Sequence, residues 1–244
     1  QKAARDIDEV GNAANRSKGQ ANSLNQSLKD LAKGASIALL TRQVVQYADT
    51  WTRSRNLLAA VGIEAKNLTQ TQDELVQIAQ STRTALEPTI FLYSRMLRAV
   101  QPLGIAQSEV ARAVEITNKA FKAGGAAVSE QNNAILQLSQ ALGSGILQGD
   151  ELRSVRENAP LIAQAIADEF DTTIAGLKKL GEQGELTTDR VFKGIIDGGK
   201  AIDAQFAVTI PTISDGFTNL TTALIQFTGK TNDASGASLL IGST

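Results

Sequence analysis

Side chains that could do chemistry are few in this sequence, and the commonest catalytic types are missing. The chain has 244 residues with no histidine and no cysteine, which excludes Ser-His-Asp and Cys-His catalysis, cysteine zinc sites and disulfides. A cluster of three acidic residues could supply the pair of carboxyl groups that a glycoside hydrolase needs. It consists of Asp150, Glu151 and Glu157. However, Asp150 and Glu151 lie where a short helix should begin, and Glu157 is spaced to pair with Arg153. We therefore interpret the cluster as helix-stabilising and predict that the chain is not an enzyme.

A second candidate, Gly229-Lys230-Thr231, resembles the end of a phosphate-binding loop. That motif needs a glycine five residues before the one in Gly-Lys-Thr, and Leu224 stands there. The preceding segment also has a helical rather than a strand-like pattern. We interpret Gly229 as the C-terminal cap of a helix, and we predict no nucleotide, metal or other cofactor.

Several arginines near the aromatic residues raise the question of nucleic-acid binding. The aromatic residues lie on apolar helical stripes, so core packing is a better interpretation than base stacking. The formal net charge is −1, without the clustered basic patch that nucleic-acid binding needs. We predict no sequence-specific nucleic-acid binding. The residues weighed are Arg42, Arg53, Arg55, Arg95 and Arg98, with Tyr47, Trp51 and Tyr93.

The composition predicts an all-α fold. Hydrophobic residues make up 42% of the chain but aromatic ones only 4%, and there are only four prolines, which is typical of helical bundles. Strand-like alternation does not persist, and Pro211 disfavours the best strand candidate, 207–213. We expect an irregular bundle of short helices after long, coiled-coil-like N-terminal ones. The capped, 3,4-periodic segments predict helices near 36–61, 88–100, 108–123, 129–142, 160–170, 188–205 and 212–228.

The first 33 residues carry apolar or small side chains at uninterrupted 3,4 spacing. Such spacing places one seam along a helix and favours coiled-coil pairing. The side chains in the middle of the seam are small and would bury little apolar surface, whereas those of Leu24, Leu28 and Leu31 are large. We predict that the seam mediates self-association, for example as a trimer, or docking to a partner. Its candidate residues are Ile7, Val10, Leu24, Leu28 and Leu31.

A second stripe follows Gly34, again at 3,4 spacing. We interpret it as the core face of an amphipathic helix, with a membrane-surface helix as the alternative. Uninterrupted apolar runs stay below the roughly 18 residues that a membrane span needs. The stripe consists of Ile37, Leu40, Val44, Tyr47, Trp51, Leu58 and Val61.

These features divide the chain into three expected parts. Residues 1–61 form the amphipathic, coiled-coil-like segment, and residues 62–230 form a compact helical domain. Residues 231–244 read as a flexible linker to the rest of a longer chain, and the start at Gln1 agrees with a fragment.

Four sequence blocks together resemble one known family. They are LLAAVGI at 57–63, DELVQIA at 73–79, ALGSGILQGDELRSVRENAPLIAQAIAD at 141–168, and GELTTDRVFKGI at 184–195. In this order and spacing they resemble the N-terminal region of tape measure proteins of tailed phages, of the siphophage and prophage type. The resemblance spans roughly residues 55–196.

The resemblance implies a structural, non-enzymatic virion protein that sets tail length. Tail-tube subunits would polymerise around it with the help of a tail assembly chaperone, and it would leave the tail during DNA ejection. Tail-tip proteins and the host membrane are further implied partners. The expected location is the tail lumen or tail end, and the host cytoplasm during assembly. Two alternatives stay open, a membrane-interacting or pore-forming segment that aids genome entry and a module of a cell-wall-degrading virion enzyme.

Overall fold

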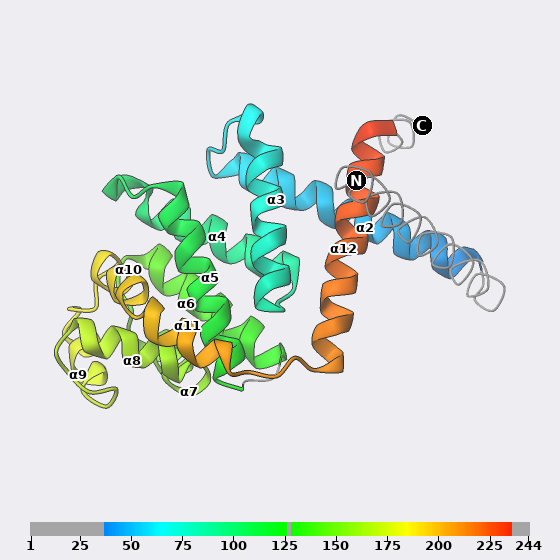
Figure 1. The fold of residues 1–244 in the computed structure, drawn as a ribbon. Helices are drawn as coiled ribbons and strands as arrows, with labels where there is room; N and C mark the ends of the chain where they lie inside the picture. The colour runs from blue at the N-terminus through cyan, green and yellow to red at the C-terminus, as the bar shows by residue number, and fades with distance from the viewer. Residues whose placement is uncertain (1–36, 126–127, 236–244) are drawn as a thin grey trace, which may run out of the picture. The chain divides into compact units, whose positions relative to one another are not determined.

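The computed structural model describes residues 37–125 and 128–235, and the regular elements there are helices (Figure 1). Within these residues the nearest approach to a sheet is one isolated antiparallel bridge between Ile146 and Thr187. The all-α prediction is therefore confirmed. Contacts divide the chain into two units, Gln1–Tyr47 and Ala48–Thr244, and the packing described below lies within the second. The predicted N-terminal seam, Ile7, Val10, Leu24, Leu28 and Leu31, lies outside the described residues.

Helix α2 (Ile37–Ala60) and helix α3 (Ala65–Thr82) come first in the described chain. α2 agrees with the predicted helix at 36–61. Thr71–Glu74 has the residue types of a capping box, but these residues do not start a helix, because they lie inside α3, which begins six residues earlier. Thr71 and Gln72 are buried there, and the Gln72 amide donates a 3.0 Å hydrogen bond to the main-chain carbonyl of Trp51. Tertiary packing therefore decides the role of these polar residues.

Helix α4 (Leu86–Val100) occupies the centre of the unit, and most of its side chains are buried. It packs against α3, α5, α6 and α10. Pro88 lies in its first turn, and a 3-10 turn, η1 (Gln101–Leu103), ends it before Gly104, whose φ is 73°. Tyr93 is fully buried, and burial, with a smaller effect of the Glu74 charge, raises its pKa to about 12.

The middle of the chain consists of short helices that glycine and proline delimit. Gly124 and Gly125 end α5, and Pro160 starts α8, as predicted. Gly143 lies in the last turn of α6, two residues beyond which Gly145 has a φ of 91°. The helices are α5 (Gln107–Ala123), α6 (Val128–Ser144), α7 (Gly149–Asn158), α8 (Pro160–Glu169) and α9 (Leu177–Glu182).

The single helix predicted at 188–205 is wrong. The segment forms two helices, α10 (Thr188–Asp197) and α11 (Gly199–Ala207), that separate at Gly198. A side chain at Gly198 would overlap Ala165 of α8. The break separates α10, which packs on both α8 and α5, from α11, which packs on α5. Long-range packing therefore splits a segment whose sequence is helical throughout.

Helix α12 (Ile213–Ser235) is the last described element, and it packs on α3. Its start is capped reciprocally, since Thr212 and Asp215 each accept a hydrogen bond from the other's main-chain N–H. Our interpretation of Gly229 as a helix cap is wrong, because α12 continues past it. Gly229 instead provides the space for Trp51 of α2, whose ring lies where a Cβ would be. Gly229 is therefore a packing residue.

We predict that Gly229→Ala lowers the free energy of unfolding by about 1–3 kcal/mol, the usual cost of overpacking. The new methyl group would overlap the Cβ, Cγ and Cδ1 atoms of Trp51. Because Trp51 is the only tryptophan and is 1% exposed, its emission should also shift to the red, measured together with chemical denaturation.

The matched control is Gly216→Ala in the same helix. Apart from its chain neighbours and the backbone of its own helix, no atom of the described residues lies within 4 Å of a Cβ built at Gly216, so the gain in helix propensity should stabilise the protein by roughly 0.5–1 kcal/mol. Equal effects of the two substitutions would contradict the proposed role of Gly229.

Candidate functional site

The three acidic residues considered in the sequence, Asp150, Glu151 and Glu157, do not form a catalytic pair. Asp150 and Glu151 occupy the first turn of α7, as predicted. The expected pair of Arg153 with Glu157 is wrong, because Arg153 instead contacts Asp150 at 3.1 Å. The side chains of Arg153 and Asp150 are 66% and 83% exposed. A general acid needs a carboxyl withdrawn from water, so these residues have the environment of a solvated helix end.

Glu157 does line a cavity of about 420 Å³ beside α7 and α9. Glu182 lines the same cavity, together with Arg153, Arg156 and Lys178. Lys178 lies 3.8 Å from Glu182, and both side chains are about two-thirds exposed. The described residues contain no group of three or more acidic side chains that could hold a metal ion. The cavity is therefore a solvated ion-pair groove.

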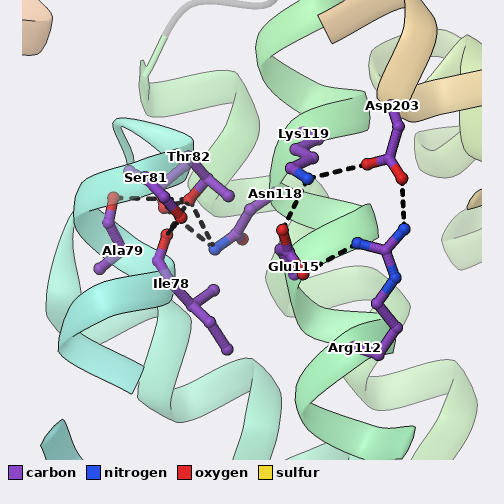
Figure 2. Close-up of polar contacts among 10 residues, drawn as sticks. Ile78, Ala79, Ser81, Thr82, Arg112, Glu115, Asn118, Lys119 and Asp203 are labelled. Carbon is purple, nitrogen blue, oxygen red and sulfur yellow. Dashed lines mark hydrogen bonds and ion pairs between the residues drawn. The ribbon is translucent and has the colours of Figure 1, made fainter. Parts of the chain in front are cut away.

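The buried polar chemistry gathers on α5, which presents polar side chains to two different helices (Figure 2). On the side of α3, Asn118 is fully buried. Its amide donates hydrogen bonds to the hydroxyls of Thr84 at 2.9 Å and Thr89 at 3.1 Å. The hydroxyl oxygens of Thr82 and Thr84 also form a hydrogen bond, at 2.8 Å. This network fixes the α3–α4 turn against α5, because buried polar groups are costly without partners.

On the other side of α5, four charged residues form an ion cluster with α11 (Figure 2). Lys119 bridges the two carboxylates, at 2.6 Å from Glu115 and 2.8 Å from Asp203. Arg112 bonds Glu115 at 2.8 Å and also pairs with Asp203. The Lys119 and Glu115 side chains are 15% and 26% exposed, so solvent screens this cluster less than a surface pair.

The ion cluster shifts the pKa values of its members toward the charged forms. Burial by itself raises the pKa of Asp203, but the hydrogen bonds from Lys119 and Arg112 outweigh it and leave that pKa below its ordinary value. The same balance lowers the pKa of Glu115. Conversely, burial lowers the pKa of Lys119, but hydrogen bonds to Asp203 and Glu115 raise it overall. The cluster is a charge-balanced clamp between α5 and α11.

The two ends of the described unit meet where α12 reaches α2. The indole N–H of Trp51 donates a 2.9 Å hydrogen bond to Asp233, and Arg55 contacts the same carboxylate at 3.2 Å. Along α12, Lys122 of α5 pairs with Asp215 at 2.7 Å. The remaining attachments join α12 to α3: Gln226 and Lys230 bond Asp73 at 3.0 and 2.9 Å, and Asn219 bonds the Gln80 carbonyl at 3.1 Å.

The predicted α2 stripe is only partly buried. Trp51, Leu58 and Val61 belong to the core, whereas Val44 is exposed and Tyr47 is half-buried. Ile37 and Leu40 lie in α2, but their side chains are outside the described set. No helix in the described part of the chain is long and apolar enough to cross a membrane.

One surface was missed by the sequence reasoning, the outward face of α12. We define the outer seam as Ile213, Phe217, Leu220, Leu224 and Phe227, of which all but the half-buried Leu224 are exposed. The 3,4 spacing was visible in the sequence, but it predicts a buried face. That this face points outward follows only from the tertiary contacts that the opposite face of α12 makes.

The part of the chain from α2 to α12, whose ends meet at Trp51 and Asp233, is also the part that matches a known protein family. The model of the family described as tape measure protein matches residues 42–233. The chain belongs to the tape measure protein family. The match covers most of the 244 residues, and it confirms the family that the sequence blocks indicate. No curated protein and no solved structure matches the chain.

This tape measure region therefore runs from α2 into the last turns of α12. The match ends at Asp233, the residue that accepts the Trp51 hydrogen bond. The family is a structural one of phage tails, so contacts between helices, rather than a catalytic centre, are the functional chemistry to examine.

We predict that Asp203→Asn destabilises the protein by an amount that depends on pH. Because the folded pKa of Asp203 lies below its ordinary value, of about 3.9, its contribution is fully present above that pH. The contribution is lost as the pH falls through the lower, folded pKa. The difference in free energy of unfolding from wild type should be constant above about pH 5 and shrink below about pH 4.

Denaturation curves at a series of pH values measure this difference. Asp150→Asn, in an exposed pair, is the control and should change stability little at any pH. A difference between wild type and Asp203→Asn that grows toward acid pH would contradict the assignment.

Proposed function

We propose that this chain is part of the ruler that sets phage tail length, and that its folded unit is the form present outside the completed tube. The observation that carries the proposal is the closure of the family region by Trp51 on Gly229 and Asp233. A closed helical unit measures little length, whereas a ruler needs length proportional to residue number.

The difference between the two forms is large. Residues 48–235 as a compact body have a radius of gyration of about 16 Å, hence a diameter of about 40 Å. The same residues as one continuous helix would span about 280 Å. Several compact copies do not fit side by side in a tube that passes one DNA duplex. We therefore propose that the unit opens into extended helices in the lumen, and that the compact form exists before assembly, at a tail end or after ejection.

The attachment of α12 supports an opening transition. Part of it consists of partly exposed ion pairs, such as Asp73 with Lys230, whose side chains are 32% and 47% exposed, and exposed pairs contribute little each. Glycines at the helix ends supply hinges. Release of α12 would uncover the α2 face around Trp51, while the helices themselves stay intact.

The proposed partners follow from this role. Tail-tube subunits and an assembly chaperone would bind the chain in the host cytoplasm, and further copies of the chain would accompany it. Tail-tip proteins and the host membrane would meet it at the end of the tail, during ejection with the DNA. The family assignment supports phage tail partners in general.

Joining α3 to α12 covalently should block assembly. We would replace Asp73 and Lys230, whose side chains touch, with cysteine in the full chain and join them with a short, reducible thiol cross-linker. The native sequence has no cysteine, so only the intended sites react. Electron microscopy should show few finished tails, with recovery on reduction.

The matched control staples one helix, with cysteines at Lys178 and Glu182 of α9, which are neighbours at i,i+4. This staple should leave assembly unchanged because α9 need not separate from itself. Cross-linked 73–230 protein found inside tails of normal number and length would refute the opening step.

We also propose that Leu24, Leu28 and Leu31 drive self-association or partner docking. Replacing all three with serine removes the large side chains of a seam in a segment too polar to fold alone. Light scattering should then show a lower mass, or a binding assay should show loss of the partner. Unchanged mass and unchanged binding together would contradict this role.

A further inference from the structure

The cavity beside α7 and α9, which we call the α7–α9 groove, has an apolar floor below its charged side chains. Leu152, which is 3% exposed, and the half-buried Ile174 form this floor. Gly181 lets α9 lie close to it, because a Cβ there would lie 2.8 Å from the Cδ2 atom of Leu152. The volume of about 420 Å³ lies within the range of ligand pockets. The groove therefore has room for a few side chains of a partner.

Five of the side chains that line the groove are charged, and three of these are already paired. Arg153 contacts Asp150 at 3.1 Å, and Lys178 lies 3.8 Å from Glu182. Arg156 differs, because it makes no ion pair or hydrogen bond with the other described residues. The groove thus presents one basic side chain whose charge is not neutralised by a neighbour.

The surroundings of Arg156 strengthen its attraction for an anion. Its Nε atom is withdrawn from solvent and has no hydrogen-bond acceptor among the described residues, which is a costly state for an N–H group. The residue as a whole is half-buried. A charge that is partly withdrawn from water interacts more strongly with an incoming opposite charge. Carboxylate and phosphate groups match the planar guanidinium best, through two parallel hydrogen bonds.

The acidic residues of the groove favour a single carboxylate over a chain of phosphates. Glu157 lines the groove next to Arg156 in sequence, is exposed, and has no ion pair with the described residues. Consecutive residues of a helix do not face each other, so Glu157 does not neutralise Arg156. A nucleic acid carries a negative charge at every nucleotide and would meet Glu157 and Glu182. A peptide with one acidic side chain and an apolar neighbour avoids this repulsion.

We propose that the α7–α9 groove binds an acidic peptide segment of another protein. One carboxylate of the segment pairs with Arg156, and an apolar side chain next to it packs on Leu152 and Ile174. A charged anchor beside an apolar contact is a common arrangement at the centre of protein interfaces. The site does not involve α12, so it depends neither on the opening of the unit nor on the ruler role.

The test begins with an array of short random peptides, probed with the full chain carrying an epitope tag. Peptides that retain the chain should be enriched in aspartate or glutamate next to a large apolar residue. The strongest peptide is then synthesised with a fluorescent label, and its affinity is measured by anisotropy. Arg156→Gln should weaken binding by about tenfold or more, because the charged anchor is lost. Glu157→Gln should strengthen binding, because a repelling charge is removed.

The matched control is Arg98→Gln. Arg98 is an exposed arginine that lines a separate cavity of about 430 Å³, so its replacement makes the same change in net charge and should leave the affinity unchanged. A charge exchange checks the contact directly: Arg156→Glu should bind the peptide better when lysine replaces its acidic residue. Circular dichroism and denaturation curves of all variants establish that each is folded as wild type is.

Several outcomes would overturn the proposal. An array that retains the chain on no acidic and apolar peptides would do so, as would an affinity that Arg156→Gln leaves unchanged or that Arg98→Gln lowers equally. Displacement of the peptide from wild type by a single-stranded oligonucleotide, at a concentration that leaves Arg156→Gln unbound, would instead assign the groove to nucleic acid.

Discussion

The close approach of Trp51 to Gly229 is the constraint on which the arrangement of the unit depends. An indole packed on a helix backbone requires glycine at that point, and this single requirement fixes the rotation of α12. With Gly229 inward, Thr222 and Asp215 must also point inward, because they lie one and two heptads earlier. The outer seam is then forced outward. One steric contact thus closes the family region and, at the same time, leaves an apolar face that the other described residues do not cover.

The interior of the unit combines apolar packing with a few specific polar contacts. The α3–α4–α5 region is held by apolar burial and by the Asn118 network with Thr84 and Thr89. The ion cluster at α11 and the largely buried Lys122–Asp215 pair at α12 add ionic contacts to α5, and buried networks of this kind specify geometry. The Asp73–Lys230 pair is more exposed, and such pairs add little stability.

The sequence was most informative where structure is decided locally. Pro88 near the start of α4 and Gly124-Gly125 at the end of α5 act through their own backbone geometry, so those boundaries were predictable. Gly198 and Gly229 are glycines of a different kind, since each makes room for a helix distant in sequence. No local pattern distinguishes these roles. The same reasoning explains α12, whose apolar spacing was readable but whose outward orientation depends on Trp51.

The separation of these contacts along the chain has a consequence for synthesis. Trp51 and Asp233 are 182 residues apart, and ribosomes add about 5–20 residues per second. The indole of Trp51 therefore waits roughly 10–40 seconds on the nascent chain before its own α12 emerges. The α2 face around Trp51 is therefore among the last parts of the unit to be covered during synthesis.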